Sequence, residues 1–347
     1  MEKEVTIYDI AKELSISPTT VSRGLNNHPA VNKNTKQKII DVASQMGYRS
    51  NTFASKLRKQ RTNTIGVIVP RLDSNFQSCV MAGMEKVANE AGYNLIISQS
   101  LETVQKEIAN ARTMFDNRVD GLLVSIAYDT ENIDHFEPFF SKGIPVLFYD
   151  RVPEHKKCTS IVIDNIQAAY KATAHLVEQG CSNIVHISGN LKVNVYKDRL
   201  KGFKYALMDS DLPFSESSVI TTNLNEEAGI QAAKQILQMN PRPDGIFVAN
   251  DNCAVSCVKT LKQAGVRIPE DIAVVGFNND PITRVIEPNL TSVDYPGNEM
   301  GEVAVRSLIN YLDGMSDVSL TNTITLRSEL VVRESTTRTG ATGAVAP

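Results

Sequence analysis

The sequence contains no run of about 18 consecutive apolar residues, the length that a membrane-spanning helix needs. Its first ten residues, MEKEVTIYDI, also lack the basic start and the apolar stretch of a signal peptide. Cysteine is scarce: the five thiols, at positions 79, 158, 181, 253 and 257, are odd in number and scattered. They suit neither a disulfide framework nor a zinc site, so we expect reduced thiols in a cytoplasmic protein with no membrane partner.

Motifs of several large enzyme classes are absent as well. The sequence has no G-x-G-x-x-G, no G-x-x-x-x-G-K-[ST], no H-E-x-x-H and no G-x-S-x-G. The five histidines show no metal-ligand spacing, and we expect His175 and His186 to be structural. Cys253 and Cys257 lie one helical turn apart, which suits two small buried residues better than a metal pair. We therefore expect no enzymatic activity, no cofactor and no metal.

The net charge alone argues against a nucleic-acid partner, because 36 Lys and Arg oppose 39 Asp and Glu and the total is −3. The charge is unevenly distributed, however. Residues 1–63 hold eleven basic and five acidic side chains and carry +6, so the remaining 284 residues carry −9. This asymmetry indicates a basic head for an anionic partner and an acidic body, although a charged patch alone is more often a solvated face. A length of 347 residues predicts two or three domains.

The basic segment begins with the pattern of two short helices. Apolar residues of TIYDIAKEL, at positions 7, 10, 11 and 14, line one helical face, and Thr6 can cap this helix together with Asp9. Ser17 can cap a second helix that carries Pro18 in its first turn. This helix, PTTVSRGLNN, should bury its residues Val21 and Leu25 and expose polar side chains at 19, 20, 22, 23 and 26.

A third helix is expected from Asn34 to Met46, ended by Gly47. Its core residues should be Ile39, Ile40, Ala43 and Met46. Two short helices joined by a tight turn form a helix-turn-helix, in which the exposed hydroxyl, amide and guanidinium groups of the second helix suit base edges and phosphates. From these residues alone, a small helical interaction module remains the alternative.

From Thr64 onward, short apolar runs alternate with amphipathic segments. The runs expected to form buried parallel strands are TIGVIVP (64–70), NLIIS (94–98), DGLLVS (120–125), IPVLFYD (144–150), SIVIDN (160–165), NIVHISG (183–189), SVITT (218–222), GIFVAND (245–251) and IAVVGF (272–277). The helices between them are expected near 76–91, 103–118, 132–142, 166–179, 196–209, 226–239 and 252–264. This alternation predicts an α/β fold with two doubly wound sheets that face each other across a cleft.

Polar residues gather where these strands should end, and ligands of doubly wound sheets bind beyond the carboxyl ends of the strands. The residues are Ser125, Asp150, Arg151, Asp164, Asn165, Asn250, Asp251, Asn278 and Asn279. Any one of them taken singly is more often a helix cap or a turn residue than a ligand-binding residue.

The run TIYDIAKELSISPTTVSRGLNNHPAVNKNTKQKIIDVASQMGYRSN closely resembles the DNA-binding head of the lactose-repressor/galactose-repressor family. The elements T-x-x-D-I-A, S-x-x-T-V-S-R-x-L-N, V-x-x-x-T-x-x-x-I and G-Y carry the resemblance, which continues to about residue 333. It implies an all-α helix-turn-helix head (1–49), a hinge helix with a linker (50–63), and a body (64–333) of periplasmic-binding-protein-like fold that binds an effector and dimerises.

The resemblance also implies how the body is divided. Lobe 1 is expected at about 64–162 and 295–325 and lobe 2 at about 164–291, with chain crossings near 160–165 and 291–296. The small and polar residues 334–347 are expected to form a disordered tail.

For DNA, the resemblance implies base reading by Thr19, beside Pro18, and by Arg23. The positions that usually hold backbone phosphates are Tyr8, Thr20, Ser22, Asn26 and His28. The segment 51–58 resembles the hinge helix, which orders only on DNA and contributes Ala54, Leu57 and Arg58. Leu57 matches a leucine that wedges between base steps in the minor groove, and Arg58 follows where a basic side chain can enter the narrowed groove. The chain departs from the family pattern at Pro18, which replaces a reading side chain, and at Ser50, which replaces a proline.

For the effector, the resemblance implies binding by residues at the cleft. They are Phe76, Ser125, Asp150, Arg199, Leu224, Asn250 and Asn278. Amide, carboxylate and guanidinium groups suit the hydroxyls of a sugar, although Arg199 could equally hold a carboxylate or a phosphate. Asn278 stands where an aspartate is common, and Leu224 stands where an aromatic ring often stacks, so a simple hexose is less expected.

Together these features predict a homodimeric, allosteric transcription regulator, a repressor of genes of sugar or related metabolism. Its expected partners are a pseudo-palindromic double-stranded DNA operator and a small-molecule effector, a sugar or a sugar derivative. A solute-binding protein of the same two-lobed fold is the alternative, but it would need an export signal and no basic head. A sugar-handling enzyme would need the motifs that are missing.

Overall fold

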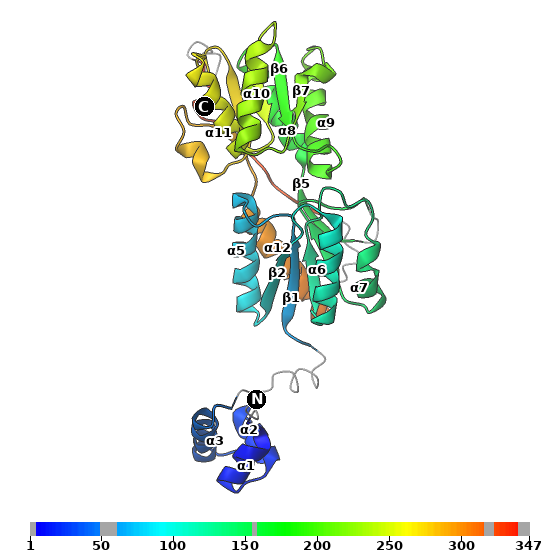
Figure 1. Ribbon diagram of the computed structural model, residues 1–347, viewed down its shortest axis with the longest axis vertical. Helices are drawn as coiled ribbons and strands as arrows, with labels where there is room; N and C mark the ends of the chain where they lie inside the picture. Colours follow the sequence, from blue (N-terminus) through cyan, green and yellow to red (C-terminus); the bar gives the residue numbers. More distant parts are fainter. Residues whose placement is uncertain (1–4, 49–60, 155–157, 316–322, 339–347) are drawn as a thin grey trace. The chain divides into compact units, whose positions relative to one another are not determined.

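The computed structural model describes residues 5–48, 61–154, 158–315 and 323–338 (Figure 1). The chain divides into two compact units, Met1–Thr62 and Asn63–Pro347, which we call the head and the body. Within the described residues, no helix is both long and apolar enough to cross a membrane.

The head consists of three helices, α1 (Ile7–Leu14), α2 (Pro18–Leu25) and α3 (Lys33–Gln45). Side-chain caps fix where they begin. The Asp9 carboxylate accepts hydrogen bonds from the backbone N–H (2.8 Å) and the hydroxyl of Thr6, and the Ser17 hydroxyl oxygen accepts one from the Thr20 N–H at 3.1 Å. Asn32 caps α3 in the same way. These caps satisfy backbone donors that a helix cannot satisfy within itself, and the first two are the caps expected from the sequence.

The core of the head is small. Its buried side chains are Ile10, Ala11, Val21, Ile39 and Ala43. The prediction for Ile40 was wrong, because 48% of this residue is exposed. Successive helical residues point about 100° apart, so Ile39 and Ile40 cannot both face the same core. Leu25 and Met46 are only half-buried at its edge.

The body contains two six-stranded sheets, one in each lobe. Lobe 1 has the strand order β11-β5-β4-β3-β1-β2, and lobe 2 has the equivalent order β12-β10-β9-β8-β6-β7. The strands of lobe 1 are β1 (Thr64–Val69), β2 (Asn94–Gln99), β3 (Gly121–Val124), β4 (Val146–Tyr149), β5 (Ser160–Ile163) and β11 (Thr323–Leu326). Those of lobe 2 are β6 (Ile184–Ser188), β7 (Val219–Thr221), β8 (Gly245–Val248), β9 (Ala273–Asn278), β10 (Thr291–Asp294) and β12 (Leu330–Val331). All described pairs are parallel except β10 with β12.

Helices flank both sheets (Figure 1). Those of lobe 1 are α5 (Asn75–Glu90), α6 (Val104–Asp116), the short η1 (Asp134–Phe136), α7 (Glu137–Ser141) and α12 (Gly297–Leu312). Those of lobe 2 are α8 (Asn165–Glu178), α9 (Asn194–Asp209), η2 (Glu216–Ser218), α10 (Glu226–Gln238), α11 (Asp251–Gln263) and η3 (Pro281–Arg284). At the crossing of α5 with α12, a Cβ atom on Gly301 would overlap the backbone oxygen of Val80, so only glycine allows this close approach.

The polypeptide passes between the lobes three times. It enters lobe 2 between β5 and α8, returns to lobe 1 between β10 and α12, and enters lobe 2 again between β11 and β12. The first two passages lie near the expected crossings. The third was not expected, because β10, β11 and β12 were not recognised as strands.

Two further expectations were wrong. The strand at 94–99 is not buried: β2 lies at the sheet edge, where one side has no neighbouring strand, and its residues are half-buried or exposed. Residues 334–338 are not disordered, because Ser335 and Thr336 are fully buried and Arg338 donates hydrogen bonds to the carbonyl oxygens of Pro269, Gln179 and Asp244.

Candidate functional site

The exposed face of α2 carries the side chains expected to contact bases. Thr19, Arg23 and Asn26 are exposed, whereas Pro18 and Ser22 are half-buried. Within the described residues, no side chain or carbonyl accepts a hydrogen bond from the Arg23 guanidinium. Since this group keeps its five donors available in solvent, it can bind guanine edges or phosphates without first breaking an internal contact.

The neighbouring residues expected to hold phosphates differ in how strongly they are fixed. Tyr8 of α1 is exposed, and the Asn26 amide donates a hydrogen bond to the Ser22 carbonyl oxygen at 2.8 Å. The Thr20 hydroxyl lies 2.8 Å from the Ser17 hydroxyl. The His28 ring accepts a hydrogen bond from the Ala30 N–H at 3.1 Å, which orients it in the turn after α2. Ala54, Leu57 and Arg58 lie outside the described residues.

In the body, Asp150 is the centre of a buried hydrogen-bond cluster. It follows β4 in a left-handed conformation (φ 58°). Its carboxylate accepts hydrogen bonds from the hydroxyls of Tyr295 (2.7 Å) and Ser125 (3.4 Å) and from the Gln77 amide (3.4 Å). Burial raises the pKa of Asp150, an effect that nearby Arg151 and the Tyr295 hydrogen bond oppose. The bond from Tyr295 is the shortest of these three hydrogen bonds.

Arg199 of α9 lies beside this cluster and is only 3% exposed. Its Nε donates to the Asn165 amide oxygen and its Nη1 to the Ala249 carbonyl oxygen, both at 2.9 Å. The guanidinium carbon lies 3.5 Å from the centre of the Phe277 ring and 5.6 Å from that of Tyr295. Burial lowers the pKa of Arg199, and no described carboxylate lies within ion-pair distance of it. Neutral oxygens and aromatic rings thus hold this cation.

Tyr295 was not predicted from the sequence, although it joins the two groups. Its ring stacks on Phe76 with the ring centres 4.2 Å apart, and its hydroxyl binds Asp150. It follows the end of β10, a strand that was not recognised, so the rule that pointed to other strand ends missed it. We call Phe76, Asp150, Arg199, Phe277 and Tyr295 the central cluster.

Polar contacts between the lobes close the central cluster on two sides. The Asn194 side chain of lobe 2 accepts a hydrogen bond from the Val152 N–H (3.2 Å) and donates one to the Asp150 carbonyl oxygen (3.4 Å). The Asn75 amide of lobe 1 donates to the Asp280 carboxylate of lobe 2 at 2.8 Å. Asp150 and Arg199 therefore lie beside a closed contact between the lobes.

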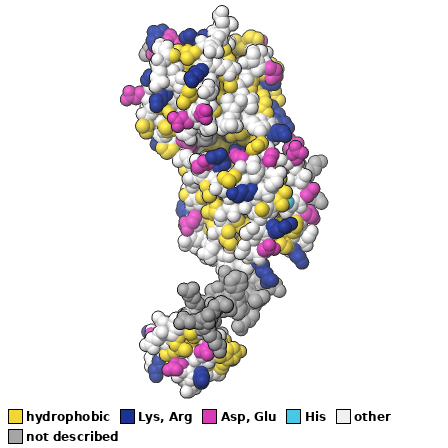
Figure 2. Space-filling model, in the orientation of Figure 1, with side chains coloured by type: hydrophobic (Ala, Val, Ile, Leu, Met, Phe, Trp, Pro, Cys, Tyr) yellow, Lys and Arg dark blue, Asp and Glu magenta, His cyan; other side chains and the backbone are white. Residues whose placement is uncertain are grey.

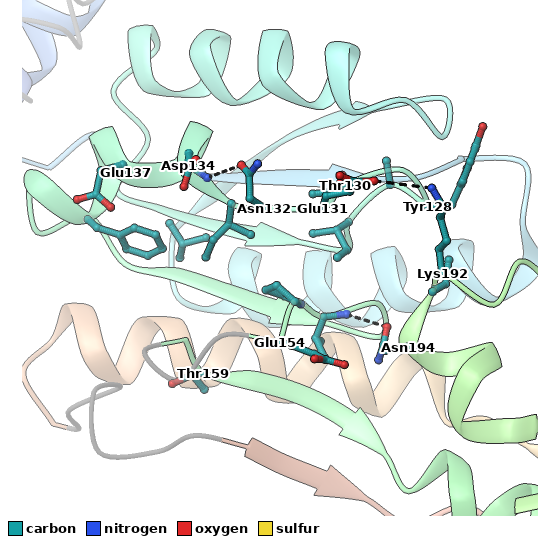
Figure 3. A pocket seen from close by; sticks show the side chains of 18 of the residues that line it. Tyr128, Thr130, Glu131, Asn132, Asp134, Glu137, Glu154, Thr159, Lys192 and Asn194 are labelled. Atoms are coloured by element: carbon teal, nitrogen blue, oxygen red, sulfur yellow. Dashed lines mark hydrogen bonds and ion pairs between the residues drawn. The ribbon is translucent and has the colours of Figure 1, made fainter. Parts of the chain in front are cut away.

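Two cavities flank this contact. One, of about 1030 Å³, is lined by Ile126, Val152, Asn194 and residues of the 128–146 segment (Figure 3). The figure shows polar side chains from Tyr128 to Glu137 along one wall and Asn194 and Glu154 along another. The other cavity, of about 670 Å³, is lined by Phe76, Asn278 and Tyr295, among others.

The seven expected effector residues are thus divided. Phe76 and Asn278 line the smaller cavity, whereas Ser125, Asp150, Arg199, Leu224 and Asn250 line neither of these two. Asn250 caps α11 by accepting a hydrogen bond from the Cys253 N–H at 3.2 Å, and Leu224 packs into the apolar core of lobe 2. Phe76, Ser125, Asp150 and Arg199 do come together, around Tyr295.

A second buried carboxylate lies close to the contact between the lobes. Asp251 accepts hydrogen bonds from the Ser292 hydroxyl (2.7 Å) and from the Asp280 N–H (2.8 Å). Burial raises its pKa to about 7, and the nearby Asp280 carboxylate adds to this rise. The Asp280 carboxylate, which Asn75 holds, also has a raised pKa because of burial.

Other expectations from the sequence can be checked in the body. Cys253 and Cys257 are buried, and burial raises the pKa of both thiols. His175 binds the Thr336 hydroxyl and His186 the Phe247 carbonyl oxygen. Figure 2 shows acidic side chains interspersed with basic ones over the visible face of the body, with no single acidic patch.

Comparisons with known proteins match both units. The family described as "Bacterial regulatory proteins, lacI family" matches residues 6–51, and the "Periplasmic binding protein-like domain" matches residues 173–336. The chain is 33% identical to catabolite control protein A of Priestia megaterium over 310 residues, which cover 89% of this chain and 93% of that protein. It is 30% identical to the HTH-type transcriptional regulator DegA of Bacillus subtilis (strain 168), over 96% of this chain and 98% of that protein.

A similar solved structure is that of the lac repressor dimer bound to operator and the anti-inducer ONPF. The TM-score is 0.84 at 24% identity, and the match covers 96% of this chain and 99% of that one. At this identity, the match supports the fold alone.

Proposed function

Because the chain belongs to the lacI family of bacterial regulatory proteins and is a DNA-binding transcription regulator, we propose that it represses genes as a homodimer on a pseudo-palindromic operator. The observation that carries this proposal is the face of α2, a helix fixed by the Ser17 cap: Thr19 and Arg23 stay exposed on it, as does Asn26 directly after its end. A dimer would place two such helices in successive major grooves.

Salt dependence tests the DNA contact. Neutralising about six phosphates gives a slope near −5 when log affinity is plotted against log salt concentration. A gel shift with random-sequence DNA and the full chain at two salt concentrations measures this slope. Absence of binding at low salt would contradict the proposal and would favour the solute-binding alternative.

The dimer is supported by an apolar surface on lobe 1. Ile97 on the edge strand β2 is 41% exposed, and Leu101, just after this strand, is 48% exposed. Leu72 lies beside them, since its N–H donates to the Gln99 side chain of β2, and it is also exposed. An exposed apolar edge strand favours aggregation, and contact with a second copy of the chain would bury it.

Oligomeric state tests this surface. We expect the double variant Ile97→Asp/Leu101→Asp to elute as a monomer in size-exclusion chromatography with light scattering. Tyr205→Asp is the matched control, because Tyr205 is equally exposed but lies on α9 of lobe 2. A double variant that keeps the mass of the wild type would place the interface elsewhere.

We further propose that a sugar or sugar derivative binds between the lobes and changes DNA affinity. Such a ligand acts only through its different affinities for the two arrangements of the lobes, a coupling of typically about 1–3 kcal/mol. A thermal-shift screen of sugars and nucleobases tests this, because a ligand of the folded state raises the melting temperature. If a nucleobase raises the melting temperature and no sugar does, the proposed ligand class is wrong. We propose a cytoplasmic location. We also propose that the protein has no catalytic role, since the chemistry of the central cluster suits binding.

A further inference from the structure

Tyr295 lies where the residues expected to bind the effector converge. Its hydroxyl is 2.7 Å from the Asp150 carboxylate, and its ring stacks on Phe76 at 4.2 Å. The Arg199 guanidinium lies 5.6 Å from the ring centre, on a side chain that also contacts Phe277. Tyr295 therefore contacts or approaches the three groups that we expect a bound ligand to contact: the Asp150 carboxylate, the Phe76 ring and the Arg199 guanidinium.

The contacts of Tyr295 match those that a hydroxylated ring would make. A carboxylate accepts a short hydrogen bond from a hydroxyl, a flat apolar face stacks on an aromatic ring, and a guanidinium lies near it. The phenol of Tyr295 donates a hydrogen bond to Asp150, stacks on Phe76 and lies near the Arg199 guanidinium, although it belongs to the chain itself. This explains why Ser125, Asp150 and Arg199 line neither flanking cavity.

Tyr295 also lies at a passage between the lobes. It separates β10 of lobe 2 from α12 of lobe 1, and its carbonyl oxygen accepts a hydrogen bond from the Gly297 N–H at 2.7 Å. Tyr295 therefore belongs to a tight turn in the segment that connects the lobes, directly before α12.

We propose that Tyr295 is a built-in occupant of the effector position, which a ligand must replace at Asp150 and against Phe76. It sets effector affinity and selects ligands that carry a hydroxyl donor beside a flat apolar face. The proposal rests on the proposed function, because it concerns the same site. Replacement of Tyr295 by the ligand moves the passage into α12 and so couples binding to the arrangement of the lobes.

A cavity variant tests the occupant without any knowledge of the effector. In Tyr295→Gly, we expect p-cresol, which reproduces the tyrosine side chain, to raise the melting temperature and to bind about tenfold more tightly than toluene. The double variant Tyr295→Gly/Asp150→Ala should lose this preference, and the wild type should bind neither probe. Equal binding of p-cresol and toluene by Tyr295→Gly would overturn the proposal.

A competition experiment connects the occupant to the effector. Any sugar that raises the melting temperature of the wild type should displace p-cresol from Tyr295→Gly. It should also bind several-fold more tightly to Tyr295→Phe, which keeps the ring and so guards against misfolding. A sugar that binds the wild type but fails to displace p-cresol would overturn the proposal. A screen in which no sugar acts would count against the sugar effector, while the p-cresol preference would still decide the role of Tyr295.

Discussion

The polar residues of the head and those of the body have opposite surroundings. On α2, Thr19 and Arg23 face solvent. In the central cluster, Asp150 and Arg199 are buried and already bonded to groups of the chain. Arg23 can therefore bind DNA without giving up an internal contact, whereas a ligand that binds Asp150 or Arg199 must replace contacts within the chain. Replacing internal contacts at Asp150 and Arg199 is one way in which ligand binding can change the conformation of the body.

The largest expected effect concerns pH and the buried Asp251. Because folding raises the pKa of this carboxyl from 3.8 to about 7, its favourable contribution is complete below pH 3.8 and is lost as the pH rises through about 7. In Asp251→Asn this loss is absent. We expect the free energy of unfolding of the variant, relative to the wild type, to increase by about 3 kcal/mol between pH 5 and pH 8.

Urea unfolding at both pH values measures this difference. Asp271→Asn is the control: Asp271 is bound to Arg267, which lowers its pKa to about 2, so this variant and the wild type should change in parallel above pH 5. If the difference in unfolding free energy between Asp251→Asn and the wild type is the same at pH 5 and pH 8, folding does not raise the pKa of Asp251.

A second prediction sharpens the contrast at Asp150. Asp150→Ala leaves the Tyr295 hydroxyl and the Gln77 amide without their acceptor, so we expect a loss of about 2–3 kcal/mol of unfolding free energy. Asp150→Asn keeps an acceptor oxygen and should retain most of the stability. Urea unfolding followed by circular dichroism compares the two. Equal losses in both variants would mean that the hydrogen bonds contribute little.

Arg23 provides the corresponding test in the head. Arg23→Ala should weaken operator binding about 10- to 100-fold, through the loss of one base or phosphate contact of about 1–3 kcal/mol. Its melting temperature should match that of the wild type, because the side chain is exposed. Arg306→Ala, on the surface of α12, is the control for a lost charge. A lower melting temperature for Arg23→Ala would show that Arg23 also stabilises the head, so that head and body would not differ in this respect.

The smallest expected effect is at the cap of α2. Ser17→Ala removes the acceptor for the Thr20 N–H and should lower the stability of the head by about 1 kcal/mol. Hydrogen exchange of the head amides in the full chain would report it as roughly fivefold faster exchange. Ser44→Ala, at an exposed position within α3, should not accelerate exchange.

The sequence predicted elements best where a local rule determines them. Capping residues and 3.6-residue periodicity placed the three head helices to within a residue or two, and apolar runs placed strands β1 to β9. The pattern could not show that β2 lies at an edge, because strand order depends on contacts between distant segments. Strands β10 (TSVD) and β11 (TITL) contain no run of consecutive apolar residues, and β12 has only two residues, so local rules missed them.

The candidate site was harder to predict than the fold. Phe76, Ser125, Asp150 and Arg199 were expected together and do converge. Asn250 and Leu224 illustrate the limit, since a side chain at a strand end can cap a helix or pack into a core instead of facing a ligand. Tyr295 was missed because it follows β10, which was not recognised as a strand, and because its hydrogen-bond partner Asp150 lies 145 positions away in the sequence.

The three passages between the lobes have a consequence for the order in which the chain folds during synthesis. The three helices of the head all lie within residues 7–45, and the buried side chains of its core come from the same segment. The sheet of lobe 1 lacks β11 until residue 326, and that of lobe 2 lacks β12 until residue 331. A nascent chain thus presents a folded DNA-binding head while both lobes still have an open sheet edge. The head is therefore synthesised well before the sheets of the body are complete.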